Sequence, residues 1–295
     1  MVTGFIEVLL AGILIGGLYG LLSSGLTLIF GITRVVNFAH GDFLTIGMYG
    51  GVVGMGFLGL SPLLALPLIT LVMFGLGMVT YLLFIAPTLN QKTVRKDDSH
   101  TSQIVITFSL GILIQNVLLM VFSANQRAVS VPWSGLIQLG SVYVGRPQVV
   151  AFAISAVCFV LLYLFLTRTR TGKAVRATVD DSDMAKMVGI ATKRMYMLSF
   201  GLGIALAGLA GVILVTYYPV TPTTGAAFLA IAFVTVVLGG LGSVVGALIA
   251  GIIVGLVQQF SAAYLAIDLQ DIGLFVLFIA VLVFRPAGLL GSKTT

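Results

Sequence analysis

The chain has 295 residues, of which 59% are hydrophobic and only 8% are charged. Soluble domains carry about a quarter charged residues, so this composition excludes a water-soluble enzyme and predicts an integral membrane protein. The formal net charge of +6 is attributed to membrane topology and to contact with anionic lipid, with no role in binding nucleic acid.

Long windows without Asp, Glu, Lys or Arg predict the membrane-spanning helices, because a spanning helix needs about 20 mostly apolar residues. The windows are Val8–Thr33, Phe43–Gln91, Ser99–Gln126, Pro147–Thr167 and Met195–Ile267. Their lengths allow one, two, one, one and three spans in turn, and the shorter apolar run Ile272–Phe284 supplies the last. We expect an all-α membrane bundle of about eight or nine spans. The alternation typical of strands is absent throughout.

The distribution of Lys and Arg predicts the orientation of these spans. Basic residues gather in Asn90–Ser99, in Arg168–Arg194 and in the tail with Arg285 and Lys293, which we place in the cytoplasm. Ser123–Pro147 and Tyr217–Ala226 are poor in them and are placed outside. The N-terminus is then outside and the C-terminus inside. We expect one membrane domain over residues 1–295, with a first half (1–145), a fifth span and cytoplasmic loop (146–194) and a second half (195–295).

Short breaks interrupt the apolar helices at Thr33–Asp42, Pro219–Gly225 and Gly239–Ser243. Breaks at membrane depth are tolerated where protein or a wet cavity satisfies the backbone. The first two breaks are followed by similar sequences, GDFLTI from Gly41 and GAAFLAI from Gly225. By the expected topology those two helices run in opposite directions, which indicates an inverted repeat of broken helices.

Glycine is abundant, with 36 residues, and is often spaced four apart, as at Gly12, Gly16 and Gly20. Such spacing places small residues on one helix face, where two backbones can approach closely in lipid. Two interpretations stay open: tight packing within this chain, or a dimer seam that uses some of these faces. The single Cys158 lies in a predicted span and is interpreted as packing.

A polar cluster stands between two apolar regions in the segment NFAHGDF, residues 37–43. Asn37 and Asp42 lie where a helix begins, and such residues satisfy free backbone N–H groups and favour the helix dipole. The alternative is that Asn37, His40, Asp42 and Thr45 line a solute path or its inner gate. Both hold together. A separate alternative makes His40 and Asp42 the proton carriers of a secondary transporter.

The loop Thr171–Thr192 predicts a short cytoplasmic helix. The run from Asp180 to Asp183 is typical of a helix start, and Gly189 is suited to a left-handed end. An apolar face for this helix is supplied by Met184, Ala185, Met187 and Val188. That helix either docks into a groove of a partner or lies on the lipid headgroups.

Signatures of ATP binding, metal binding and catalysis are missing from the sequence. Gly172-Lys173 lacks the upstream glycine of a phosphate-binding loop, and Ala174 stands where Ser or Thr is needed. The two histidines, His40 and His100, are far apart. We therefore assign no catalytic residue, no metal and no cofactor to this chain.

Four segments, in order along nearly the whole chain, resemble the branched-chain amino acid ABC permeases of the LivH type. They are GLYGLLSSGLTLIFGITRVVNFAHGDFLTIGMY (Gly17–Tyr49), GKAVRATVDDSDMAKMVGI (Gly172–Ile190), VVLGGLGSVVGALIAG (Val236–Gly251) and FRPAGLLG (Phe284–Gly291). The resemblance implies a type II ABC importer permease fold in a prokaryotic plasma membrane.

The resemblance also implies partners and a role for the cytoplasmic loop. The expected partners are a second permease of the LivM type, two cytoplasmic ATPases that bind ATP and Mg²⁺, and an extracytoplasmic solute-binding protein. The residues expected to couple this chain to the ATPases are Gly172, Arg176, Asp180, Asp181, Ala185, Gly189 and Ile190. Branched-chain amino acids are the default solute, with urea or short amides as alternatives. On the outer side, Arg127 and Arg146 either pair with the binding protein or are ordinary surface residues beside an interfacial Trp133.

Overall fold

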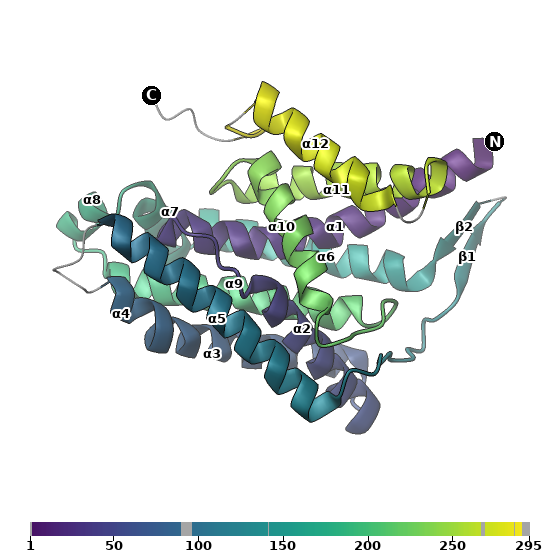
Figure 1. Cartoon of the computed structure of the whole chain (residues 1–295), viewed down its shortest axis with the longest axis horizontal. Helices are drawn as coiled ribbons and strands as arrows, with labels where there is room; N and C mark the ends of the chain where they lie inside the picture. Colours follow the sequence, from purple (N-terminus) through teal and green to yellow (C-terminus); the bar gives the residue numbers. More distant parts are fainter. Residues whose placement is uncertain (1, 90–95, 141, 267–268, 286, 291–295) are drawn as a thin grey trace.

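The computed structural model describes residues 2–89, 96–140, 142–266, 269–285 and 287–290, and its long helices run side by side in one bundle (Figure 1). Among the described residues, six helices are long and apolar enough to cross a membrane, and α10 and α12 are shorter apolar helices. The expected all-α membrane fold is therefore confirmed. The predicted cytoplasmic residues Lys92, Arg95 and Lys293 lie outside the described residues.

The elements follow one another in a simple order. The first half contains α1 (Val2–Thr33), α2 (His40–Gly51), a π-helical turn (Val52–Phe57), α3 (Pro62–Thr80), a second π-helical turn (Tyr81–Ile85), α4 (Ala86–Leu89), α5 (Lys96–Phe122), β1 (Leu136–Leu139) and β2 (Val142–Gly145). The rest contains α6 (Arg146–Arg168), α7 (Arg170–Asp180), α8 (Ser182–Met187), α9 (Thr192–Leu214), α10 (Thr224–Gly239), α11 (Val244–Tyr264) and α12 (Gln270–Phe284).

Helices α1 and α9 form the centre of the bundle. They pack on each other, while α11 runs along α1 and α3 runs along α9. A Cβ atom added to Gly25 of α1 would lie 2.6 Å from the carbonyl oxygen of Gly203 in α9, and one on Gly203 would lie 2.7 Å from that of Gly25. These reciprocal contacts show that the backbones of α1 and α9 touch where the two helices cross.

The glycine face of α1 packs within the chain. Added Cβ atoms on Gly12, Gly16 and Gly20 would lie 2.8, 2.6 and 3.0 Å from backbone Cα atoms of α11. Two helix backbones approach this closely only where side chains are absent. Of the two interpretations of this face, packing within the chain is therefore confirmed.

All three predicted breaks are present, at residues 34–39, before Thr224 and between α10 and α11. The first break turns back into the bundle, because His40 at the start of α2 contacts the carbonyl of Leu22. Leu22 precedes the end of α1 by eleven residues, or about 16 Å along a helix. Helix α2 therefore begins at mid-depth. It meets α10 there, since Gly41 and Gly225 contact each other through their backbones.

Two elements were not predicted. The expectation that strand patterns are absent is wrong for the outer loop, where β1 and β2 form a small antiparallel hairpin with Leu136 opposite Gly145. Strands of four residues are too short for alternation to stand out. Helix α7 was missed although Gly172, Val175 and Thr178 mark its buried face at helical spacing.

Candidate functional site

The start of α2 gathers the four residues predicted to form a path or gate. Asn37 supplies the turn: its Oδ1 accepts a hydrogen bond from the backbone N–H of Ala39 at 3.1 Å. This contact satisfies one of the N–H groups just ahead of the helix. Asn37 therefore shapes the turn ahead of α2, whose N-cap residue is Ala39 without a side-chain cap. The amide Nδ2 of Asn37 has no hydrogen-bond partner within the described residues.

His40 fixes the depth of this helix start. Its Nε2 lies 3.1 Å from the carbonyl oxygen of Leu22 in α1. Since a carbonyl only accepts, Nε2 carries a proton, and a neutral ring leaves Nδ1 as an acceptor. That Nδ1 is buried and, in the part of the chain that the structure describes, has no hydrogen-bond partner. The ring is fully enclosed, beside Gly25.

Asp42 connects α2 to α5. Its Oδ1 accepts a hydrogen bond of 2.9 Å from Nε2 of Gln115. Gly111, one turn earlier on α5, leaves room for the carboxyl group, because a Cβ there would lie 2.5 Å from Oδ2. The position of Asp42 in the first turn suits the helix dipole, but its side chain is used to bridge two helices.

Thr45 closes the cluster on the side of α10. Its hydroxyl donates to the carbonyl of Gly41 at 3.2 Å, and a Cβ on Gly225 would lie 2.7 Å from that hydroxyl. The exposed fractions of Asn37, His40, Asp42 and Thr45 are 2%, 0%, 5% and 0%. The structure brings the four residues together in a packed interior, where they border no open cavity among those described.

The second predicted set lies at one end of the bundle, on α7 and α8 (Figure 1). Asp181 begins α8, because its Oδ1 accepts from the N–H groups of Asp183 at 2.9 Å and Met184 at 3.0 Å. The helix ends as predicted at Gly189, which has a φ of +86°. The N–H of Ile190 then donates to the carbonyl of Ala185, the buried residue of this short helix.

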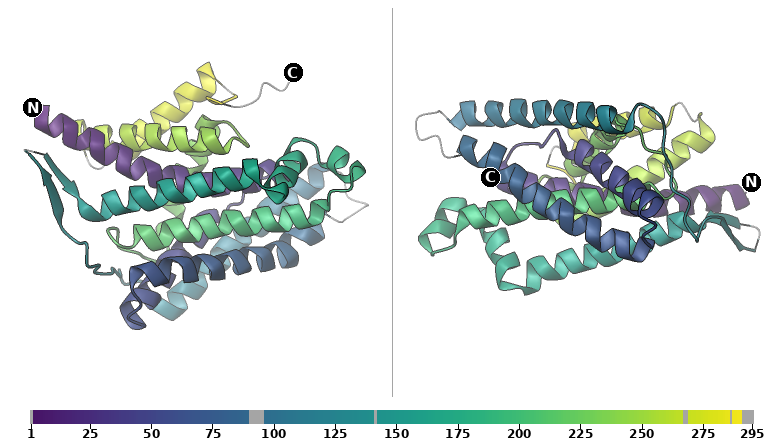
Figure 2. Two further views of the ribbon diagram at one scale, coloured as in Figure 1. Left: turned by 180° about the vertical axis from the view of Figure 1, so that it is seen from behind. Right: turned by 90° about the horizontal axis from the view of Figure 1, so that it is seen from below.

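In the part of the chain that the structure describes, nothing covers the apolar face of α8. Met184, Met187 and Val188 are 62%, 83% and 78% exposed. Gly172 explains how this segment folds back at the end of α6, since a Cβ there would collide with the carbonyl of Phe165. Figure 2 shows α7 and α8 projecting at the end of the bundle remote from the N-terminus.

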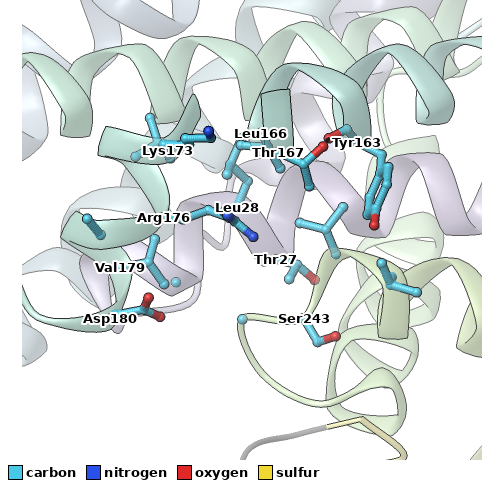
Figure 3. A pocket seen from close by; sticks show the side chains of 16 residues that line it. Thr27, Leu28, Tyr163, Leu166, Thr167, Lys173, Arg176, Val179, Asp180 and Ser243 are labelled. Carbon is cyan, nitrogen blue, oxygen red and sulfur yellow. Dashed lines mark hydrogen bonds between the residues drawn. The ribbon is translucent and has the colours of Figure 1, made fainter. Parts of the chain in front are cut away.

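Arg176 and Asp180 lie apart from that exposed face. With Lys173 they border a cavity of about 560 Å³ between α7, α1, α6 and the start of α11 (Figure 3). The seven predicted coupling residues are therefore neighbours in sequence but face two different surroundings.

A second cavity, of about 340 Å³, lies near the opposite end of the bundle and was not predicted. Tyr19 of α1 borders it and donates a hydrogen bond of 2.6 Å to Oε1 of Gln258 in α11. Nε2 of Gln258 lies 3.4 Å from Oδ1 of Asp271 at the start of α12. A glutamine within an otherwise apolar helix was the available signal for this site.

Arg127 on the predicted outer side is held within the chain. Its guanidinium carbon lies 5.8 Å from the ring centre of Phe57 and 5.6 Å from that of Phe122. Its backbone pairs with Val220 through bonds of 3.0 and 2.8 Å. These contacts join the loop after α5 to the loop before α10.

Among the described residues no group of three or more His, Cys, Asp and Glu lies close enough to hold a metal. The candidate site is instead a membrane bundle with half-helices meeting at mid-depth, a buried polar cluster and a projecting apolar helix. These features define a multi-pass membrane transport protein.

The comparisons with known proteins give the family. Residues 8–282 match the family described as branched-chain amino acid transport system / permease component. The chain is 30% identical to the high-affinity branched-chain amino acid permease BraD of Pseudomonas aeruginosa, over 97% of this chain and 96% of that one. It is equally identical, with the same coverage, to the LivH permease of Escherichia coli. The chain belongs to this family of permease components.

Two further similarities extend the comparison. A probable LivH permease of Methanocaldococcus jannaschii is 27% identical over 96% of this chain and 92% of its own length. The structure of PsaBC from Streptococcus pneumoniae in complex with Fab superposes with a TM-score of 0.54 and covers 97% of both chains. At 14% identity, that likeness shows the fold alone.

Proposed function

We propose that this chain is one of two permease subunits of an ATP-driven importer and that its solutes are branched-chain amino acids. The observation that carries this proposal is the match to the permease family along almost the whole chain. The solute follows from the names of relatives that align over nearly their full lengths. A related permease of the LivM type completes the path, and a solute-binding protein delivers the solute from outside.

The exposed apolar face of α8 supports a docked ATPase. Met184, Met187 and Val188 are largely exposed, and a short apolar helix of this kind fits a groove in a partner. The cytoplasmic end is then the end with α7 and α8, and ATP with Mg²⁺ is bound by two partner chains. The same face resting on lipid headgroups is the alternative, and the experiments below separate the two.

The polar cluster at the start of α2 serves as a gate in this proposal. Asn37, His40, Asp42 and Thr45 are enclosed, so they control the path through the position of α2. The bridge from Asp42 to Gln115 makes that position depend on α5. A movement that separates α2 from α5 must break this hydrogen bond.

The deciding experiment is transport in liposomes by the purified chain, with and without its partners and internal ATP. Radiolabelled leucine, isoleucine, valine and urea are offered in turn. We expect uptake of the three amino acids only when the partners and ATP are present. Uptake by the chain alone, driven by a proton gradient, would contradict the importer and support His40 and Asp42 as proton carriers.

Docking is tested by Met184→Ser with Met187→Ser, with Met184→Leu and Met187→Leu as the apolar control. We expect the serine variant to lose the ATPases on purification and about 90% of uptake, since interface cores depend on buried apolar side chains. Thermal stability of the chain stays within about 0.5 kcal/mol, because the replaced side chains are exposed. Full retention of the ATPases would assign this face to lipid.

A further inference from the structure

The cavity bordered by α7 has the shape and charge of a site for an anionic phospholipid. It is lined by three elements of the bundle, α1, α6 and the start of α11, and by Lys173, Arg176 and Asp180 of α7. Figure 3 shows Lys173 and Arg176 reaching from α7 toward the space that Thr27 and Ser243 border. The lining of this cavity contains two cationic groups and one carboxylate, so its net charge is positive.

The cationic groups are not used by the protein itself. Within the described residues the ion pair of α8 joins Lys186 to Asp183, and neither Lys173 nor Arg176 makes a side-chain hydrogen bond there. Beneath the cavity surface the hydroxyl of Thr27 is fully buried, and among the described residues it has no hydrogen-bond partner. A buried hydroxyl without a partner costs stability unless a ligand or water satisfies it.

The start of α11 adds backbone donors to the same cavity. Ser243 caps the helix by accepting from the N–H of Gly246 at 3.1 Å. The N–H groups of Val244 and Val245 precede that bond and have no partner inside the helix. Helix α11 has 21 residues, and the positive end of its dipole faces the cavity together with the two cations. Such a combination favours a phosphate group.

Apolar stripes lead from this polar end toward the middle of the membrane. On α6, Tyr163 borders the cavity, and Val160 lies one turn deeper. On α11, Val245 borders it, and Ile249 lies one turn deeper. These four side chains are 45%, 53%, 38% and 41% exposed. Both helices pack on α1. We call the cavity together with these exposed apolar side chains the groove.

We infer that this groove holds one phospholipid with a net negative headgroup, its phosphate at Lys173, Arg176 and the start of α11. Its acyl chains then lie along the stripes of α6 and α11. Basic pockets between helices at the cytoplasmic surface bind anionic headgroups by the same physics. The lipid joins α7 to the bundle core and stabilises the segment next to α8. This inference does not depend on the solute; it uses the proposed cytoplasmic position of α7.

Native mass spectrometry of the purified complex, exchanged into phosphatidylcholine with a minor fraction of phosphatidylglycerol, tests the inference. We expect one retained phosphatidylglycerol for each copy of this chain. In Lys173→Gln with Arg176→Gln its affinity falls roughly 30-fold, since each cation at a charged headgroup contributes about fivefold. The matched control is Arg168→Gln with Arg170→Gln, which removes the same charge outside the cavity and keeps affinity within about threefold.

A second variant keeps the inference testable where the Lys173→Gln, Arg176→Gln double variant does not assemble. Arg176→Gln alone removes one cation and leaves Lys173 in place, and we expect about fivefold weaker retention. Equal losses in the Lys173/Arg176 variant and in the control would overturn the inference, as would equal retention of phosphatidylcholine.

Two further probes, photoreactive acyl chains and inorganic phosphate, distinguish the phospholipid from other occupants of the groove. Phosphatidylglycerol with such chains is expected to label α6 and α11 in the whole complex. Labelling blocked by a second permease lying in the groove would assign the groove to that chain. Thermal stabilisation by millimolar inorganic phosphate alone, equal to that by the lipid, would identify a free phosphate site instead.

Discussion

The starts of α2 and α8 use the same local chemistry in opposite surroundings. Each is preceded by an Asx side chain that accepts a backbone N–H two residues on, Asn37 from Ala39 and Asp181 from Asp183. Asn37 is 2% exposed, whereas Asp181 lies on the surface. At α2 the polar residues are therefore the unusual feature, and at α8 the exposed apolar residues are.

This difference determines which substitutions matter. At α2, a substitution that removes one hydrogen-bonding side chain leaves its partner buried in a packed interior. The folded state then loses the full free energy of desolvating that unpaired polar group. At α8 water replaces any partner that is lost, so side-chain bonds contribute little there. The following changes test that contrast, from the largest expected effect to the smallest.

Replacing the glycines where α2 and α10 meet is expected to have the largest effect. Gly41→Val or Gly225→Val places a side chain into the backbone of the other helix, and overpacking of this kind costs about 3 kcal/mol or more. We expect almost no monodisperse protein on size-exclusion chromatography. Gly75→Val is the control, because a Cβ at Gly75 meets no atom within 4 Å. A normal yield of Gly225→Val would contradict the described crossing.

Removing the carboxyl group of Asp42 is expected to abolish uptake or assembly. Asp42→Ala leaves Nε2 of the partly buried Gln115 without its acceptor, at a cost of about 1–3 kcal/mol. Adding Gln115→Leu removes that unpaired amide and should restore most of the thermal stability. If Asp42 acts in the gate, uptake in liposomes stays absent in the restored double variant. Normal uptake by well-expressed Asp42→Ala would remove Asp42 from the candidate site.

Cap removal compares the two helix starts directly. Asn37→Ala leaves the N–H of Ala39 without its acceptor inside the bundle, and we expect a loss of about 1–3 kcal/mol. Asp181→Ala exposes its two N–H groups to water and should cost about 1 kcal/mol, confined to α8. Thermal unfolding of the whole chain reports the first, and hydrogen exchange of Asp183 and Met184 reports the second. If Asn37→Ala and Asp181→Ala lowered the stability of the whole chain equally, the contrast between the two helix starts would be wrong.

The sequence predicted the membrane bundle and its breaks because their causes are local. Charge-free windows of spanning length need no tertiary knowledge, and the break at Gly239–Ser243 is apparent from its glycines. Gly189 and the acidic run before Met184 likewise marked both ends of α8 correctly.

The contacts of the polar cluster could not be predicted from the sequence, because they join residues that are far apart along the chain. Asp42 is bridged by Gln115, which lies 73 positions away, and His40 contacts Leu22 only because the chain turns back at mid-depth. Likewise, Lys173 and Arg176 share a cavity with Ser243 through the packing of three helices. Neighbouring residues in the sequence do not reveal which helix face will meet which.

The smallest expected effect is at the surface pair of α8. Nζ of Lys186 lies 2.9 Å from Oδ1 of Asp183, and the two side chains are 55% and 82% exposed. The hydrogen bond that Lys186 donates to the carboxylate of Asp183 raises the pKa of Lys186 above its ordinary value. A raised lysine pKa contributes stability that is complete below the unfolded pKa, about 10.4, and is lost as pH rises through the folded one.

Asp183→Asn is therefore expected to lower stability by no more than about 0.5 kcal/mol, because exposed pairs at this spacing are weak. That difference from the unmodified chain stays constant between pH 6 and pH 9 and shrinks above about pH 10.4. Thermal unfolding of both proteins across this range, at low and high salt, measures it. A difference above about 1 kcal/mol, or one that changes near neutral pH, would mean that the surroundings of α8 are less exposed than those of a free surface helix.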